Sequence, residues 1–593
     1  MKLNKGSFYK GRSKFVYFLI FYLILTVCLY IFVFANRTVY DDWVLDGVFI
    51  PVAVFVVISV VAMTLLHNNK KLVLIAGIFL GSINIIPGLK YSSFFDTFDG
   101  PGHYRFAEQI ALLGHIPQNE FYSSTYGANP AMHIFVASLS IISGISVNDV
   151  LKFFIPVLFG LIPFIIYLIG HNILDDNTLK YTIIASILPV IQAYVIWGTV
   201  LAFIPYLLLV SVFILLTLPK VHSRIFFLLF AVLGFVVVTS HTVTSLLVSM
   251  LFLGVFLIPT FYGNLRKKPS SLNVWKYSLV VLVFLILLWG WWSTVGAVNL
   301  DYLVSILRTL IHPSIPVIPT RFFQLSIITQ LQIFIVLNMA NSVVAALSVL
   351  GLLVFIDQTR KGKVFNETKR LYIMVTVLVL IVSFFVVVQI IANFGLFSYQ
   401  RLLISGFPWC FFLMGLILSR INFSLRRVTS IARTALLSSL LVVLVLLCLI
   451  QVYPYQPLVP RANVLSTTLP SNDYIVDLNL VNTVYQRYMI SFAANHSRVG
   501  PIVADIVSRD QSYGFSDPSF FSRIEYPSPL YPENQNMPWN LYLLHTSKAG
   551  PFGEKVEYRT DSIIQNVRND AGDVVYDNGA SFIISNPTQN NVP

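Results

Sequence analysis

A short polar stretch between apolar segments carries the residue types best suited to chemistry. Residues 92–117, SSFFDTFDGPGHYRFAEQIALLGHIP, bring together Asp96, Asp99, His103 and Arg105. A carboxylate in such a segment can accept the proton of an attacking hydroxyl or orient a nucleophile, as a general base does. Imidazole and guanidinium groups beside it can hold a phosphate through charge-assisted hydrogen bonds. The stretch is therefore a candidate acid–base site for a phosphate-bearing substrate, with Asp99 as the first choice of base and Asp96 as the second.

Asp99 also has a purely structural interpretation. Gly-Pro-Gly at 100–102 disfavours helix just before HYRFAEQIALLG, so Asp99 is predicted in a bend ahead of a helix N-terminus. A carboxylate there is stabilised by free N–H groups and by the helix dipole. Phe106, Ile110 and Leu113 recur at helical spacing, so one face of this helix is expected to lie on lipid or on other helices. The sequence leaves both interpretations of Asp99 open.

Composition places these residues in a membrane protein. The chain has 593 residues, of which 56% are hydrophobic and 11% are charged, whereas soluble domains carry about 25% charged residues. Up to residue 452, apolar runs of roughly 17 to 25 residues recur, each long enough to cross a hydrocarbon core of about 30 Å. We therefore predict an α-helical polytopic membrane protein.

The basic residues indicate how these runs are oriented. The net charge is +13, and its basic residues are clustered at the N-terminus and near 68–71, 264–271, 360–370 and 420–433. Short basic clusters between apolar runs are the positive-inside pattern of membrane proteins, so no nucleic-acid partner is predicted. The pattern places the N-terminus in the cytoplasm.

About 13 transmembrane helices follow from this pattern. The predicted spans are 15–35, 48–66, 72–89, 150–170, 181–198, 202–219, 225–240, 243–261, 275–292, 331–356, 371–393, 402–418 and 434–452. Counting 131–146 as a span would put every later basic cluster outside, so it is predicted to be an amphipathic or re-entrant helix at the outer surface. The large outer loops are then 90–150 and 293–330, and the polar stretch lies in the first of them.

Four further basic side chains are predicted on the same outer side. They are His133, His241, Arg321 and Arg401. Ionisable residues at membrane level are costly, so each is a candidate for binding a substrate. Each also has a structural interpretation, as a helix cap, a turn residue or an arginine that extends to the interface. The sequence does not decide between the two.

The composition changes at about residue 453. YPYQPLVPRANV is a proline-punctuated linker, and the residues after it alternate turn signals with strand-like runs such as YIVDLNL, PIVADIV, DVVYDNG and SFIIS. Acidic residues outnumber basic ones there, as suits an external segment. We predict a transmembrane domain over 1–452 and a soluble extracytoplasmic mixed α/β domain over 453–593.

Several motifs occur in a familiar order. DGPGHYRFAEQIALLG places Asp99, His103, Ala107 and Gly114 in the frame Asp-x-x-x-(aromatic or His)-x-x-x-Ala-x-x-(apolar)-x-x-x-Gly. YQRLLISGFPWCFFLMG (399–415) begins a late span with an arginine outside, and an external domain ending in VVYDNGASFIIS follows. In order and topology the chain resembles the GT-C superfamily of integral-membrane glycosyltransferases, which includes protein O-mannosyltransferases, aminoarabinose transferases and the catalytic subunit of oligosaccharyltransferase.

The resemblance implies a GT-C-like fold and a transferase that uses a polyprenyl-phosphate or polyprenyl-diphosphate sugar donor at the outer face. By the match, Asp99 would be the catalytic carboxylate, Arg401 would meet the lipid phosphate, and His103 and His133 would line the donor or acceptor pocket. The acceptor would be a glycan, a lipid or a protein. The oligosaccharyltransferase pattern has a second acidic motif in the next outer turn, where this chain has YVIWGTVLAFIP. A divalent cation is therefore not indicated, and no cofactor is expected.

Other functions stay open at this point. A polymerase or ligase of glycan repeats would use a similar donor. A flippase or transporter of lipid-linked glycans would carry charges deep in many spans and two similar halves, which this sequence does not show. A structural or receptor-like protein would have a dispensable Asp99. An enzyme that acts on such a donor at the outer face is expected in a prokaryotic plasma membrane, for example an archaeal one.

Overall fold

The structure, a computed structural model, describes a set of helices and five short strands. The described residues are 5–36, 48–90, 100–117, 125–171, 173–188, 197–216, 223–265, 274–301, 303–304, 339–362, 371–380, 383, 399–424, 429–452, 502–504, 524–525, 541–545, 573–577 and 581–585. The catalytic candidates Asp96 and Asp99, together with Arg321, lie outside these ranges.

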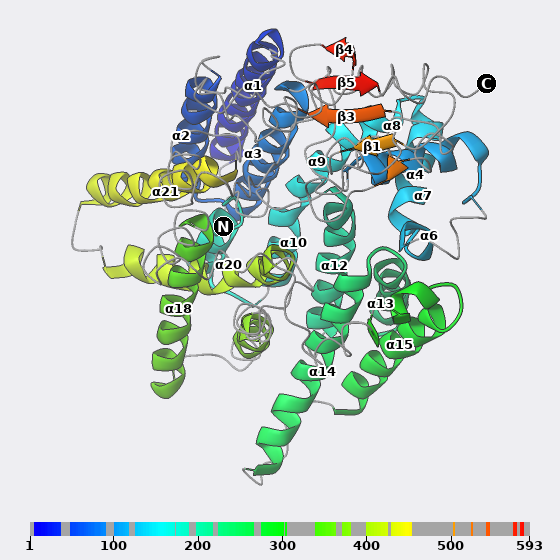
Figure 1. The fold of residues 1–593 in the computed structure, drawn as a ribbon. Coiled ribbons are helices and arrows are strands. Elements are labelled where there is room, and N and C mark those ends of the chain that lie inside the picture. Colours follow the sequence, from blue (N-terminus) through cyan, green and yellow to red (C-terminus); the bar gives the residue numbers. More distant parts are fainter. Residues whose placement is uncertain are drawn as a thin grey trace, which may run out of the picture.

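The helical elements lie between residues 5 and 452 (Figure 1). They are α1 (Lys5–Ala35), α2 (Phe49–Leu65), α3 (Asn69–Lys90), α4 (Gly100–Leu113), α6 (Thr125–Ala128), α7 (Ala131–Ser143), α8 (Val147–Asp149), η1 (Val150–Phe154), α9 (Ile155–Val157), η2 (Leu158–Leu161), α10 (Ile162–Gly170), α11 (Asp176–Ala185), α12 (Trp197–Leu216), α13 (Ser223–Val238), α14 (Thr242–Leu265), α15 (Val274–Trp292), α18 (Met339–Arg360), α20 (Tyr399–Ser424) and α21 (Ser430–Val452). Figure 1 shows α12 near the middle, and it packs against both α10 and α13.

Four of the described helices are long and apolar enough to cross a membrane, by length and composition. They are Phe15–Ala35, Asn69–Ile86, Val147–Gly170 and Val343–Arg360. Shorter apolar helices of 10–17 residues, such as Ile50–Leu65 and Arg224–Val238, coincide with other predicted spans. The chain is therefore compatible with a helical membrane protein, while the count of 13 spans stays a prediction.

The predicted span 181–198 differs from the helix observed there. Helix α11 begins at Asp176 and ends at Ala185, and residues 189–196 lie outside the described part. The start is set by a polar cap, because the Asp175 carboxylate accepts hydrogen bonds from the backbone N–H groups of Asn177 and Thr178. A hydropathy window misses such a cap, since it follows only the apolar run.

Buried polar pairs join helices that are distant in sequence. The Tyr22 hydroxyl of α1 lies 2.8 Å from the Ser59 hydroxyl of α2. The Trp409 indole of α20 donates to the Tyr206 hydroxyl of α12 at 2.9 Å. Where no hydrophobic effect drives helices together, such hydrogen bonds and close packing hold a membrane bundle.

The first outer loop of the sequence prediction is largely helical where it is described. Helix α4 starts at Gly100, so the expectation that Gly-Pro-Gly precedes the helix is wrong. Proline is tolerated in a first helical turn, because the N–H it lacks has no partner there. Phe106 and Ile110 are buried as the periodicity predicts, but Leu113 is 53% exposed. Leu113 lies in the last turn of α4, past the helices that cover the other two.

Helix α7 corresponds to the run predicted as a helix of the outer surface. It has 13 residues, which at 1.5 Å per residue span about 20 Å, less than a hydrocarbon core of about 30 Å. It ends at Gly144, whose φ of 68° is the left-handed conformation favoured by glycine at helix ends. Length alone therefore disfavours α7 as a span.

The following run, Val147–Gly170, is helical throughout but irregular. It passes from α8 into the π-helical turn η1, then through α9 and the 3₁₀ turn η2 into α10. Pro156 and Pro163 stand in the first turns of α9 and α10. Each proline removes a backbone donor, so the hydrogen-bond pattern shifts around it.

The described strands form one mixed sheet near the C-terminus. They are β1 (Ile502–Ala504), β2 (Ile524–Glu525), β3 (Leu541–His545), β4 (Asp573–Asp577) and β5 (Ser581–Ser585), in the order β2-β1-β3-β5-β4. β1 is parallel to β2 and β3, whereas β5 is antiparallel to β3 and β4. β1, β4 and β5 coincide with three strand-like runs of the sequence, and YIVDLNL lies outside the described residues.

Candidate functional site

Helices α4 and α7 pack together and set the geometry of the site. Phe106 of α4 and Ala137 of α7 belong to a small buried apolar cluster, and Tyr126 of α6 packs beside it. The cluster forms because each helix turns its apolar face toward the other. This packing brings His103 of α4 against His133 of α7.

The two imidazole rings are in direct contact. His103 Nδ1 lies 2.8 Å from His133 Nε2, so one ring donates a hydrogen bond to the other. The rings are stacked with their centroids 5.0 Å apart. Tyr126 meets both rings edge-on, at 4.7 Å from His103 and 5.6 Å from His133, and Phe106 meets His133 edge-on at 4.9 Å. Aromatic contacts on several sides thus fix the orientation of the pair.

Burial keeps His133 neutral. Its side chain is 3% exposed. Burial first, and then the neighbouring His103, lower the pKa of His133 well below its usual range, while the backbone of Asn129 opposes the shift. Its second nitrogen, Nδ1, is buried, and the backbone of Asn129 is a polar neighbour of the ring, although no hydrogen bond of standard geometry joins them. A buried imidazole with a shifted pKa is a candidate for a functional role.

Arg105 is buried too, but on another face of α4. It is 7% exposed and follows His103 by two residues, which turns it about 200° around the helix axis. Arg105 therefore starts from a different face of α4 than His103 does.

Lys152 is a buried cation that sequence reasoning did not select. It is 3% exposed and lies in η1, a π-helical turn that packs against α7. Its ammonium sits 5.1 Å from the centroid of the Phe153 ring. A lysine near the start of an apolar run is usually taken as a span boundary, and only its burial and the π-turn mark it.

A buried hydrogen-bonded triangle anchors the N-terminal end of α7. The Asn129 amide donates to the Thr242 hydroxyl and to the Asn299 carbonyl oxygen, each at 3.1 Å. The Thr242 hydroxyl donates to the same Asn299 oxygen at 2.5 Å. Beside it, the Trp291 indole donates to the carbonyl of Ala128 at 2.9 Å. These contacts fix the start of α7 to α14 and α15, so the triangle positions the histidine pair.

His241 has a structural role in addition to any functional one. It directly precedes α14, and its Nδ1 accepts the backbone N–H of Thr244 at 3.2 Å. The Thr244 hydroxyl lies 3.0 Å from the same nitrogen. A side chain before a helix that binds the third N–H acts as an N-cap. The turn before α14 contacts α7, the helix that carries His133, because the carbonyl of Thr239 accepts a hydrogen bond from the backbone N–H of Ala131.

The side chains of four other predicted site residues lie outside the part of the chain that the structure describes. Asp96, Asp99 and Arg321 lie outside the described residues, and Arg401 lies in the first turn of α20 with its side chain outside the description. Gly114 is the glycine of the motif DGPGHYRFAEQIALLG. It follows α4 in the left-handed conformation, with φ 73°, which gives it a backbone role.

The buried histidine makes stability depend on pH. Because its folded pKa lies below the unfolded value near 6.5, the unfolded chain binds the proton first, and stability falls as the pH drops below about 6.5. We expect a loss of up to about 1.4 kcal/mol per pH unit in that range, measured as the unfolding midpoint in detergent. His133→Gln should flatten this slope, whereas His115→Gln, at an exposed position of the same segment, should keep it. Equal slopes in wild type and His133→Gln would contradict the assignment.

In the part of the chain that the structure describes, no group of three or more His, Cys, Asp or Glu side chains is arranged to hold a metal ion. The aspartates of the polar stretch lie outside that part, so metal independence stays a prediction. The arrangement offers a fixed pair of imidazoles, of which the buried His133 stays neutral. In the comparisons with known proteins, no family model and no curated protein matches this chain.

Proposed function

We propose that the protein is a membrane glycosyltransferase that moves a sugar from a polyprenyl-phosphate-linked donor to an acceptor at the outer face of the membrane. The observation that carries the proposal is the contact between His103, which follows Asp99 by four residues, and the buried His133. A transferase of this kind needs a carboxylate beside groups that bind a phosphate leaving group.

The imidazole pair suits the leaving group. Since His133 stays neutral, its Nε2 can accept the Nδ1–H of His103, and this hydrogen bond stabilises a positive charge on His103. A protonated His103 binds a phosphate oxygen through a charge-assisted hydrogen bond. His133 is then a positioning residue, which acts through His103.

The Asp99 carboxylate activates the acceptor. Asp99 removes the proton from the acceptor hydroxyl, the hydroxyl oxygen attacks the anomeric carbon of the sugar, and the polyprenyl phosphate leaves with the electrons of the broken bond. Asp99 stands directly before α4, so the backbone order brings the base to the helix that carries His103. Lys152, buried beside α7, adds positive potential at the same end.

The test compares sugar transfer by wild type and His103→Gln. Membranes that contain each variant are incubated with labelled polyprenyl-phosphate sugars and a panel of hydroxyl-bearing acceptors. Loss of one hydrogen bond to a charged group is worth about 1.5 to 3 kcal/mol, so we expect transfer to fall roughly 10- to 100-fold.

His115→Gln is the matched control, because His115 is exposed in the same segment. It should transfer at nearly the wild-type rate. Unchanged transfer by His103→Gln at equal expression, or no transfer by wild type from any such donor, would contradict the proposal.

A further inference from the structure

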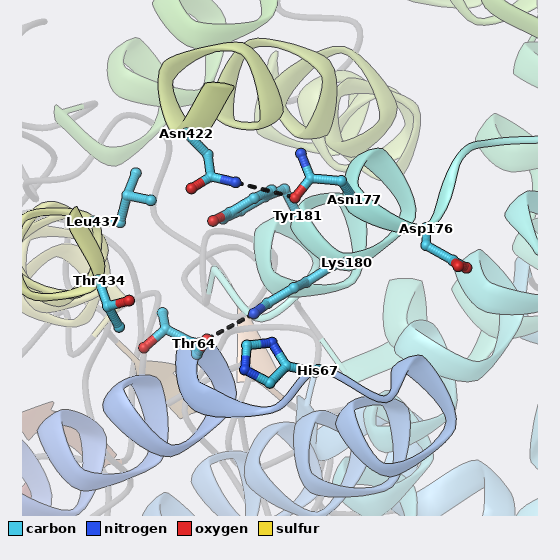
Figure 2. A pocket seen from close by; sticks show the side chains of 9 residues that line it. All are labelled: Thr64, His67, Asp176, Asn177, Lys180, Tyr181, Asn422, Thr434 and Leu437. Atoms are coloured by element: carbon cyan, nitrogen blue, oxygen red, sulfur yellow. Dashed lines mark hydrogen bonds between the residues drawn. The ribbon is translucent and has the colours of Figure 1, made fainter. Parts of the chain in front are cut away.

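A polar cavity is lined by none of the residues of the histidine pair. Its volume is about 290 Å³, and it opens between the ends of four helices, α2, α11, α20 and α21 (Figure 2). Its lining residues are Thr64, His67, Asp176, Asn177, Lys180, Tyr181, Asn422, Thr434 and Leu437. The volume is near the lower limit of about 300 Å³ for small-ligand pockets, which suits a head group better than a whole lipid.

Lys180 provides the positive charge of this cavity. Its ammonium donates to the carbonyl of Thr64 at 2.7 Å, and Figure 2 shows it pointing toward Thr64 and His67. An ammonium has three N–H donors, so two remain without a hydrogen-bond partner among the described residues. Figure 2 shows the Asp176 carboxylate pointing away from Lys180, and the Asn69 amide lies 3.4 Å from it. Among the described residues Lys180 therefore has spare donors and no ion pair with a carboxylate.

Polar groups around the ammonium add hydrogen-bonding capacity. The Asn422 amide donates to the Asn177 carbonyl oxygen at 3.1 Å, which holds α20 and α11 at the cavity wall. This hydrogen bond occupies the side-chain oxygen of Asn177. The second N–H of the Asn422 amide is a further donor. A site with one cation and several donors matches an anion such as phosphate.

Three exposed apolar side chains are next in sequence to residues that line the cavity. Leu65 of α2 is 57% exposed, Leu436 of α21 is 55% exposed and Phe423 of α20 is 50% exposed. A ligand that fits both surfaces has a phosphate for Lys180 and apolar chains for these three side chains, which describes a phospholipid and not a free phosphate.

Helix α3 relates this cavity to the first site. Asn69, at the start of α3, donates to the carbonyl of Asp176, a lining residue, at 3.1 Å. The other end of α3 leads toward α4 and His103. The 22 residues of α3 span about 33 Å, and α4 follows its other end in the sequence. The positive-inside pattern predicts that the cavity end, with the basic cluster 420–433, is the cytoplasmic one.

We propose that this cavity binds the head group of an anionic phospholipid of the inner leaflet, with the phosphate on Lys180 and the acyl chains against α2, α20 and α21. The site would tie this end of the helix bundle to acidic lipid. This lipid site is independent of the proposed sugar transfer, and the two proposals are tested by separate experiments.

The test measures binding by the purified full-length protein in a neutral detergent. Phosphatidylglycerol, phosphatidylcholine and inorganic phosphate are titrated separately, and the unfolding midpoint is followed at each concentration. We expect phosphatidylglycerol alone to raise the midpoint. Lys180→Gln should weaken its apparent affinity by at least about tenfold, the effect of one lost hydrogen bond to a charged group.

Lys361→Gln is the matched control, because it removes the same charge from an exposed lysine that pairs with Asp357 outside the cavity. Its affinity for phosphatidylglycerol should stay within about twofold of wild type. If Lys180→Gln fails to fold, Thr434→Ile, which narrows the cavity, takes its place with the same expected loss. Equal stabilisation by phosphatidylcholine or inorganic phosphate, none by any of the three, or unchanged affinity in the cavity variants would overturn the proposal.

Discussion

Replacing Asp99 by asparagine is expected to lower the rate of sugar transfer by about 100- to 10,000-fold, the contribution typical of a general base. The amide has the size of the carboxylate and can still accept a hydrogen bond at a helix N-terminus. It cannot take the proton of the acceptor hydroxyl. The substitution therefore separates the catalytic interpretation of Asp99 from the capping one, since a cap would survive in large part.

Asp96→Asn is the control for this experiment, because it makes the same chemical change three positions earlier. Transfer by this variant should change by less than about fivefold, the range expected of a solvated charge. Expression and unfolding midpoint are measured for both variants. Equal rates for Asp99→Asn and wild type would remove Asp99 from the mechanism, and a loss confined to Asp96→Asn would identify Asp96 as the base.

Gly415→Ala is expected to destabilise the protein by about 1 to 3 kcal/mol, the usual cost of overpacking. Gly415 of α20 faces Thr182 of α11. A Cβ added there would lie 2.1 Å from the Thr182 hydroxyl oxygen and 2.7 Å from its backbone N and Cα. Thr182 is fully buried, so neither helix can move aside without losing contacts. The measurement is the unfolding midpoint of the purified protein in detergent.

Gly290→Ala is the control, and we expect that it does not destabilise the protein. Gly290 lies in α15, and an added Cβ would have nothing within 4 Å in the described structure. Alanine favours helix over glycine by up to about 1 kcal/mol, so this variant should match or exceed the stability of wild type. A similar loss in both variants would mean that the close approach of α11 and α20 does not account for the effect.

Hydropathy predicts the helices that the structure describes between residues 5 and 452 better than it predicts their ends. Long apolar runs become helices because a membrane offers the backbone no other hydrogen-bond partners. The ends follow polar details instead. Asp175 starts α11 ahead of the predicted span, and Pro101 fits inside the first turn of α4 where the sequence suggested a break.

The candidate site was less predictable, because it depends on tertiary contacts. His103 and His133 could be selected by residue type, but their contact joins residues 30 positions apart and depends on how α4 packs on α7. Lys152 was missed because an isolated lysine next to an apolar run has an ordinary explanation. Its burial is visible only once η1 packs against α7.

The triangle of Asn129, Thr242 and Asn299 sets an order of assembly during synthesis. Asn129 and Asn299 are 170 residues apart, so the triangle cannot close until α15 has left the ribosome. At roughly 5 to 20 residues per second, about 10 to 30 s separate the synthesis of the two asparagines. The helices that carry the histidine pair are made early, but their anchor arrives late. The histidine site is therefore completed only after more than half of the helical part of the chain has been made.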